Sequence, residues 1–364
     1  MVQSPAYTTT PIEYRRLFDD ELRERILASK EELGKRLVIL THHYQRREVV
    51  AFGDFKGDSY ALCKHAAAQG AEYIVFCGVH FMAEASVILA RPEQKVYLPN
   101  PLAGCPMADM APIDLVLAAW EELGDSVDLS RMVPITYMNS DADLKAFCGR
   151  NGGTVCTSSN AKVSLEWAYQ QGERVFFFPD QHLGRNTGNL LGIPRDQIYL
   201  WDYNTPPAER DKKAIKRAHL ILWNGYCHVH RVFVPHHVEA IREAYPDARI
   251  VVHPECTEDV VALADAVGST SFIVKYVTEQ PAGSIIAIGT DLNLIDRLAH
   301  ENKDKTILEL AGQTCAMCVN MYRTTLSDVA YTLDSLDTRR PMQVPEEVQK
   351  YAKIALEQML TIAG

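Results

Sequence analysis

The sequence predicts an α/β protein made of three similar modules, each with a short parallel sheet covered by helices. Two observations lead to this fold class. Short, wholly apolar runs of strand length alternate with amphipathic segments of helix length, which is typical of parallel strands buried on both faces. The alternation strand–helix–strand–helix–strand also occurs three times, over spans longer than the repeat of a solenoid. Three small α/β domains therefore explain the pattern better than a repeat array.

Each pass begins with a strand that leads into polar residues. The strands expected in the first pass cover residues 37–40, 73–79 and 96–98, with helices from Ser59 to Gly70 and over 81–90. In the second pass we expect strands at 132–136, 154–156 and 175–178 and helices at 141–149 and 160–171. In the third pass we expect strands at 250–252 and 285–288 and helices at 257–267, 269–277 and 291–300.

Three further segments set the expected boundaries. Residues 12–33 have the apolar spacing of an amphipathic helix, and residues 344–363 predict a capped C-terminal helix with Pro345 in its first turn. Pro206-Pro207 and the charged stretch 209–217 are typical of a surface crossover. The expected organisation is an N-terminal helix with the first module over residues 1–118, the second module over 119–215, the third over 216–312, and a C-terminal segment packing on the body over 313–364.

Composition and charge exclude several classes of protein. Of 364 residues, 47% are hydrophobic and 23% are charged, which allows a large core and excludes a disordered or collagen-like chain. The net charge of −10 disfavours binding to nucleic acid or to an anionic membrane. No apolar run approaches the ~18 residues of a membrane span, and no signal peptide is recognisable, so we expect a cytoplasmic protein with reduced thiols.

Polar residues gather where the predicted strands end, and this is where chemistry is found in parallel α/β sheets. These residues can bind carboxylates or phosphate, or move protons near neutral pH. They are His42, Tyr44, Tyr137, Asn139, Ser158, Ser159, His253, Glu255 and Thr270, with His230 close to a cysteine. Neutral donors and histidines would also let an acidic protein hold an anionic ligand.

The nine cysteines divide by position. Cys63, Cys77 and Cys148 fall within helical or strand patterns and are expected to be packing thiols, whereas Cys156 and Cys256 at strand ends could pack or line a site. Cys315-Ala-Met-Cys318 fits a redox pair, half of a zinc site or a cluster ligand, and no second C-x-x-C is present. One thiolate from this motif, with those of Cys105 and Cys227, could give three thiolates, an incomplete ligand set that would leave one iron of a cluster open as a Lewis acid.

Nucleotide-binding motifs are lacking in the sequence. No dinucleotide fingerprint G-x-G-x-x-G follows a predicted strand, and no P-loop sequence occurs. The glycine-bearing turn at residues 53–59 could present N–H groups to an anion or be only a capped loop. Nicotinamide and P-loop chemistry are therefore disfavoured.

Several short strings match a known family in order and spacing. They are Thr41–Gln45, Gly57–Ser59, Cys77–Glu84, Pro99–Cys105 with Met107–Asp109, Tyr137–Asn139, Thr157–Ala161, Pro179–Gly184, Trp223 through Cys227 to His230, His253–Cys256, Gly268–Thr270 and Cys318-x-x-Met321. On these strings the sequence resembles the quinolinate synthases, iron–sulfur enzymes of NAD biosynthesis, over roughly residues 35–330.

The resemblance implies a specific reaction and fold. The family condenses iminoaspartate with dihydroxyacetone phosphate, with loss of phosphate and two waters, and an L-aspartate oxidase would be a functional partner. It folds as three α/β modules about a pseudo-threefold axis and holds a 4Fe–4S cluster with one cysteine per module. By motif these ligands would be Cys105, Cys227 and Cys318, with Cys315 as an accessory thiol.

Within this reaction, the residue types of the polar set suggest the roles of its members as hypotheses. Its catalytic members would be Tyr44, Tyr137, His253 and Glu255. Its substrate-binding members would be His42, Ser59, Asn139, Ser158, His230 and Thr270. His43 is given no role.

Two other function classes stay open at this point. An iron–sulfur hydro-lyase would use the same open iron on another small carboxylic acid. A non-enzymatic metal-binding or redox regulator would instead need four protein ligands and no vacant iron, and would leave the polar set without a purpose.

Overall fold

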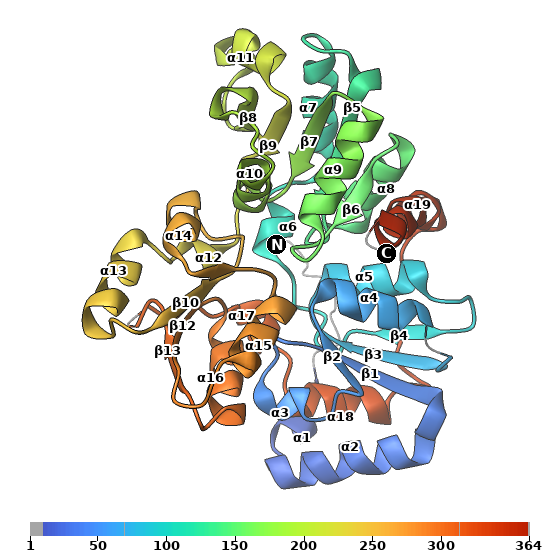
Figure 1. Ribbon diagram of the computed structural model, residues 1–364. Coiled ribbons are helices and arrows are strands. Elements are labelled where there is room, and N and C mark those ends of the chain that lie inside the picture. The colour runs from blue at the N-terminus through green and yellow to red at the C-terminus, as the bar shows by residue number, and fades with distance from the viewer. Residues whose placement is uncertain (1–9, 69, 313, 363–364) are drawn as a thin grey trace. The chain divides into compact units, whose positions relative to one another are not determined.

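Three small parallel sheets, flanked by helices, make up the fold of the computed structural model, which describes residues 10–68, 70–312 and 314–362 (Figure 1). The sheets have four, five and four strands. The predicted α/β class with three similar modules is therefore confirmed, whereas the module boundaries and the pseudo-threefold axis stay predictions. The chain forms two compact units, one of residues 1–105, 292–297 and 317–344, the other of residues 106–291, 298–316 and 345–364.

The first unit contains a sheet with strand order β2-β1-β3-β4. Its strands are β1 (Leu37–His42), β2 (Phe55–Gly57), β3 (Tyr73–Cys77) and β4 (Lys95–Tyr97). All six residues of β1 are buried, because this strand is central and has helices on both faces. Strand β2 was not expected, since only one of its three residues, Phe55, is apolar.

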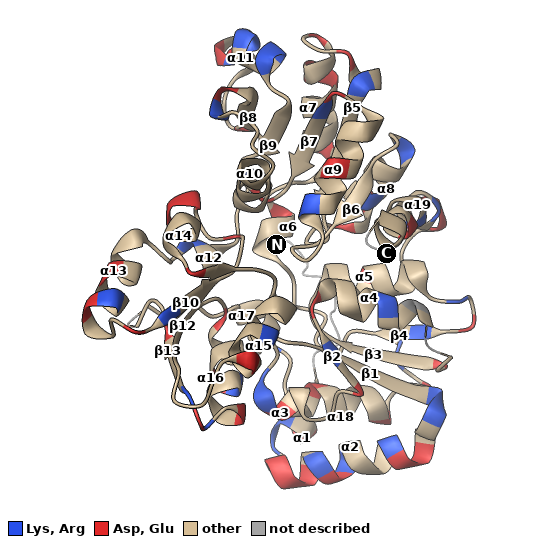
Figure 2. Cartoon of the chain, in the orientation of Figure 1, with Lys and Arg blue, Asp and Glu red and all other residues tan. Residues whose placement is uncertain are grey.

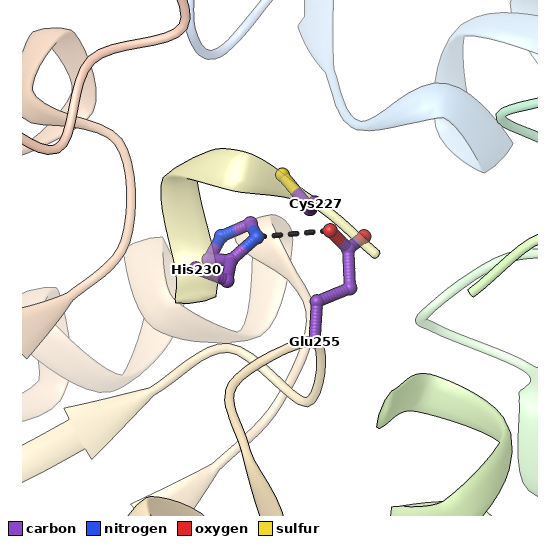
Figure 3. A group of neighbouring side chains, drawn as sticks. All are labelled: Cys227, His230 and Glu255. Carbon is purple, nitrogen blue, oxygen red and sulfur yellow. Dashed lines mark hydrogen bonds and ion pairs between the residues drawn. The ribbon is translucent and has the colours of Figure 1, made fainter. Parts of the chain in front are cut away.

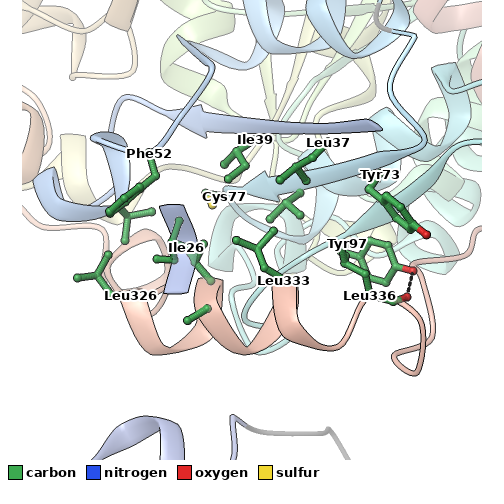
Figure 4. Close-up of a cluster of buried hydrophobic side chains, with 14 of the residues drawn as sticks. Ile26, Leu37, Ile39, Phe52, Tyr73, Cys77, Tyr97, Leu326, Leu333 and Leu336 are labelled. Carbon is green, nitrogen blue, oxygen red and sulfur yellow. Dashed lines mark hydrogen bonds between the residues drawn. The ribbon is translucent and has the colours of Figure 1, made fainter. Parts of the chain in front are cut away.

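Helices from both ends of the chain cover this sheet. On one face lie α4 (Ser59–Ala68) and α5 (His80–Leu89); on the other, α2 (Asp19–Leu33) packs with α18 (Leu326–Asp334). Ile26, Ile39 and Leu333 are members of the apolar cluster that lies between the sheet and the pair α2 and α18 (Figure 4). Helix α18, from the C-terminal part of the chain, thus belongs to the core of the first sheet.

The predicted helix over residues 12–33 is wrong as a single element. Two helices, α1 (Ile12–Arg15) and α2, form instead, because the chain is extended at Phe18, whose N–H donates to the Glu21 carboxylate at 3.0 Å. Both signs of charge alternate along α2 on its outer side (Figure 2), which is typical of a solvated helix face.

The middle sheet, in the second unit, has strand order β6-β5-β7-β9-β8. Its strands are β5 (Met132–Tyr137), β6 (Thr154–Cys156), β7 (Arg174–Phe178), β8 (Ile198–Trp201) and β9 (Leu220–Trp223), and its helices include α7 (Ile113–Gly124), α8 (Ala142–Arg150), α9 (Ala161–Gln171), α10 (Gln181–Leu190) and α11 (Lys212–Arg217). The C-terminal helix α19 (Glu346–Ile362) packs on α8. A Cβ at Gly149 would lie 2.0 Å from the carbonyl oxygen of Tyr351, so this approach of the two helices requires glycine.

The third sheet, also in the second unit, has strand order β11-β10-β12-β13. Its strands are β10 (Arg249–Val252), β11 (Ala266–Val267), β12 (Ile285–Gly289) and β13 (Thr306–Glu309), and its helices are α12 (His228–Arg231), α13 (Pro235–Ala244), α14 (Glu258–Leu263) and α15 (Thr270–Glu279). Helix α16 (Leu292–Glu301) follows β12 in the chain, and its residues 292–297 are counted with the first unit. In all three sheets the second strand pairs on one side of the first and the third strand on the other.

The predicted helix over residues 257–267 is also wrong, because α14 ends at Leu263 and Ala266–Val267 forms the edge strand β11. Asp265 causes the change: its carboxylate accepts the N–H of Ile250 at 2.7 Å, and its own N–H donates to the carbonyl of Ile250 at 2.9 Å. Asp54 makes the same two bonds to Ile39, each at 2.8 Å. The first and third modules therefore fix their edge strands in the same way.

None of the helices within the described residues is both long and apolar enough to cross a membrane.

Candidate active site

The leading strands of the three modules carry their polar residues at equivalent places. Leu40, Ile135 and Val251 are the residues at which each leading strand begins to pair with its short edge strand. Counting from them, His42, Tyr137 and His253 occupy one equivalent position. Tyr44, Asn139 and Glu255 occupy a second, two residues further on. The predicted residues of the three modules thus occupy the same two backbone positions but have different side chains.

In two modules the same hydrogen bond fixes the histidine ring. His42 Nδ1 accepts the N–H of Tyr44 at 3.1 Å, and His253 Nδ1 accepts the N–H of Glu255 at 3.3 Å. Each bond ties the ring to the backbone two residues further along the loop. The loop backbone therefore orients both rings.

Glu255 is the centre of a buried set in the second unit. Its Oε1 accepts from Tyr137 Oη at 2.5 Å, and its Oε2 lies 2.9 Å from His230 Nδ1. His230 Nε2 lies 3.1 Å from Thr290 Oγ1, and the His230 and His253 rings stack with centroids 4.4 Å apart. The structure thus brings together three of the predicted residues from β5, α12 and the loop after β10 around one carboxylate.

Opposing effects set the ionisation of this carboxylate. Burial alone would raise the pKa of Glu255, but the charges of His230 and His253 and the hydrogen bonds from His230 and Tyr137 lower it to about 2. Burial, then the charge of Glu255 and the hydrogen bond to it, raise the pKa of Tyr137 well above its ordinary value. At neutral pH the set therefore holds an ionised carboxylate beside a phenol that keeps its proton.

Asp180 lies in the same buried environment, although it is not among the polar residues predicted from the strand ends. It lies two residues beyond the end of β7 and caps α10, where its Oδ1 accepts the N–H groups of His182 and Leu183 at 2.7 and 2.9 Å. Burial, together with the charge of Glu255, raises the pKa of Asp180 well above its ordinary value. Its place at the end of an apolar strand could have identified it, as could its position in a matched string.

The remaining predicted residues of the second unit are Ser158, Asn139 and Thr270. Ser158 is half-buried, and a hydrogen bond with it lowers the pKa of Tyr137 in part. Asn139 Oδ1 is buried and has no hydrogen-bond partner among the described residues, so it could accept from a ligand. Thr270 is buried at the first position of α15, next to the capping hydroxyl of Ser269.

The predicted residues of the first unit form their own cluster. The rings of His42 and Tyr44 meet edge to face with centroids 4.9 Å apart, and Asn293 donates to the carbonyl of Tyr44 at 3.1 Å. Ser59, at the start of α4, is also buried. All three side chains therefore lie at the carboxyl end of β1 or at the helix start beside it.

His43, which has no predicted role, is bound to a buried arginine. The Arg297 guanidinium donates to His43 Nδ1 at 2.9 Å, and both side chains are buried. Burial and then the charge of Arg297 lower the pKa of His43 to about 3. The two residues stand far apart in the sequence, and no sequence signal links them.

Four of the buried cysteines are poor candidates for a metal. Burial raises the pKa of each of these thiols, and a metal ligand must be a thiolate. They are Cys77, Cys148, Cys156 and Cys256. Cys105, Cys227 and Cys318 are half-buried, and Cys315 is exposed.

Cys105, Cys227 and Cys318 share a local structure that Cys315 lacks. Each directly precedes a helix of four residues: α6 (Pro106–Asp109), α12 and α17 (Val319–Tyr322). A half-buried thiol therefore stands at the same place before each of three short helices, which gives three equivalent possible ligands. These three thiols suit an iron–sulfur cluster better than the fully buried thiols do.

A second possible ligand group is already occupied by hydrogen bonds. The ligand atoms of Cys227, His230 and Glu255 lie within 4.8 Å of one another (Figure 3). However, His230 Nδ1 is bonded to Glu255 and its Nε2 to Thr290. Metal binding by His230 would break one of these bonds, so Cys227 is the member best suited to a metal.

The parallel sheets and the buried carboxylate–imidazole–phenol set define an α/β enzyme. A family model described as quinolinate synthetase A protein matches residues 24–361. The chain is 47% identical over 363 residues to a quinolinate synthase of Corynebacterium glutamicum, covering 99% of this chain and 92% of the relative. It is 46% identical over 364 residues to that of Rhodopirellula baltica (96% and 93% covered) and 48% over 361 residues to that of Geobacillus sp. (97% and 96% covered). The chain belongs to the quinolinate synthetase A family.

The His43–Arg297 contact predicts a pH-dependent stability. An unfolded histidine binds a proton below about pH 6.5, whereas folded His43 stays neutral down to about pH 3, so the free energy of unfolding falls as pH drops through this window. His43→Gln offers Arg297 an amide oxygen as acceptor in place of Nδ1 and cannot titrate. We expect a flatter dependence of the thermal unfolding midpoint on pH in this variant. The exposed His236, changed to Gln, is the control, and an unchanged slope for His43→Gln would contradict the assignment.

Proposed function

We propose that this chain condenses iminoaspartate with dihydroxyacetone phosphate to quinolinate, with loss of phosphate and two waters. The observation that carries the proposal is the buried Glu255 carboxylate, bonded to both Tyr137 and His230 in a member of the quinolinate synthetase A family. We also propose a cytoplasmic location, where thiols remain reduced, and supply of iminoaspartate by an L-aspartate oxidase.

The buried set contains both groups that a dehydration needs. Tyr137 holds its proton and shares it with Glu255; to donate to an oxygen of the bound intermediate, its O–H would turn away from Glu255, which is ionised and can accept a proton. His230, His253 and Tyr44 are the further groups proposed to pass protons. Two groups whose environments drive their pKa values apart make an acid–base pair.

The anionic substrates are proposed to be held by neutral donors. His42, Ser59, Ser158 and Thr270 can donate to carboxylate or phosphate oxygens, and Asn139 offers both a donor and an acceptor. Such donors hold an anion without adding positive charge, in a chain whose net charge is −10. Binding by an acidic protein therefore depends on local groups rather than on its overall field.

Cys105, Cys227 and Cys318 are proposed to hold a 4Fe–4S cluster. When bound, the cluster supplies a Lewis acid at the iron that no cysteine ligates. The support is the shared position of these three thiols before short helices and the burial of the other candidates.

Substitution of single cysteines tests the ligand set. We expect Cys105→Ser, Cys227→Ser and Cys318→Ser each to lose most iron and sulfide after anaerobic purification, while Cys315→Ser keeps about four irons per chain. Metal analysis and electron paramagnetic resonance are the measurements. Loss of the cluster in Cys315→Ser with retention in Cys318→Ser would overturn the assignment, and zinc in place of iron would favour a metal-binding regulator.

Removal of the central carboxylate tests the reaction. Glu255→Gln keeps the size of the side chain and removes its basicity, so we expect kcat for quinolinate formation to fall by about 10²- to 10⁴-fold. Glu258→Gln, three residues further on and paired with Arg195, is the matched control. Quinolinate should be assayed anaerobically from iminoaspartate and dihydroxyacetone phosphate. A wild-type protein with a full cluster that forms no quinolinate but dehydrates another small acid would instead be a hydro-lyase.

A further inference from the structure

We propose that Asn186 is a positioning residue that holds the Glu255 loop in register with Tyr137; this inference rests on the proposed function of that site. Asn186 is half-buried on α10, and its Nδ2 donates to the carbonyl oxygens of Pro254 and Cys256, each at 2.8 Å. These two residues flank Glu255 in the sequence. Since both partners are carbonyl oxygens, only the NH₂ end of the amide can face them.

The loop that carries Glu255 has little regular structure of its own. Residues 253–257 link β10 to α14, and their internal bonds are short turns, such as Cys256 N–H to the carbonyl of His253 at 3.0 Å. Asn186 gives this loop two hydrogen bonds from an element outside it. Its amide therefore fixes the peptide groups on both sides of the central carboxylate.

Helix α10 is a rigid support because it lies close against the middle sheet. A Cβ on Gly184 would lie 2.4 Å from Leu222 Cδ2, and one on Gly188 would lie 2.8 Å from Leu220 Cδ2. Asp180 caps the helix at the end of β7, the strand that pairs with β5. The position of Asn186 is thus tied to the sheet whose strand β5 ends at Tyr137.

Asn186 consequently links the two segments that carry Tyr137 and Glu255, whose hydrogen bond is the shortest in the site. Tyr137 comes from the middle sheet and Glu255 from the loop after β10, and their oxygens lie 2.5 Å apart. Without the amide, the loop loses two of the hydrogen bonds that hold it to elements outside it, beside the bond from His253 N–H to the carbonyl of Gly289, and can shift relative to Tyr137. A displacement of about 1 Å in a reacting constellation can lower the rate about 100-fold while substrate binding changes little.

The test compares three variants of the cluster-loaded enzyme. We expect Asn186→Ala to lower kcat by about 10- to 100-fold with KM nearly unchanged and with wild-type iron content. Asn186→Asp has the same shape but places a carboxylate against two carbonyl oxygens, so it should be at least as slow. Asn189→Ala, on the same helix and bonded to Glu258 instead of the loop, should behave as wild type.

A second readout does not depend on activity. Amide hydrogen exchange in residues 253–257 should be faster in Asn186→Ala than in the wild type and unchanged in Asn189→Ala. If Asn186→Ala had the kcat of the wild type and the same amide hydrogen exchange in residues 253–257, the inference would be overturned. A loss of activity fully accounted for by a loss of iron would overturn it as well. A wild-type enzyme that makes no quinolinate defeats the proposed function, whereas the exchange experiment still decides whether Asn186 fixes the loop.

Discussion

One buried negative charge, the carboxylate of Glu255, constrains the chemistry of the second unit. A carboxylate removed from water is costly unless hydrogen bonds and opposite charges compensate it. Here Tyr137 and His230 approach its two oxygens, and His253 stacks on His230. The end of β5, the short helix α12 and the loop after β10 must therefore meet at one point. Thr290 and Asp180 belong to the same arrangement, since Thr290 engages His230 and the charge of Glu255 helps to raise the pKa of Asp180.

A repeated backbone geometry supplies these side chains. The three leading strands place residues at the same two positions beyond their pairing with an edge strand, and Asp54 and Asp265 brace the first and third modules identically. In the middle module the equivalent of Ile39 and Ile250 is Pro134, which has no N–H to be braced. The three modules thus share one backbone arrangement at the end of the leading strand. The side chains at the two equivalent positions differ, and they determine the chemistry of each module.

Features that depend on neighbouring residues can be predicted from this sequence, whereas contacts between segments far apart in the chain cannot. Apolar strands followed by polar residues identified Tyr137, His253 and Glu255, because a strand end can be recognised from a few neighbouring residues. The apolar spacing of residues 257–267 predicts one helix, because it carries no signal of the bonds between Asp265 and Ile250. Asn186, Thr290 and the His43–Arg297 pair depend on contacts between segments far apart in the chain. The catalytic and binding roles of the polar set stay predictions until they are tested.

The protonation state of Glu255 is the most direct test of this arrangement. Difference infrared spectroscopy of the wild type against Glu255→Gln reports whether this carboxyl group is ionised. Because its pKa is lowered to about 2, we expect the carboxylate bands to persist from neutral pH down to about pH 4. A protonated-acid C=O band at neutral pH that disappears in Glu255→Gln would show that burial outweighs Tyr137 and the two histidines, and would contradict an ionised centre.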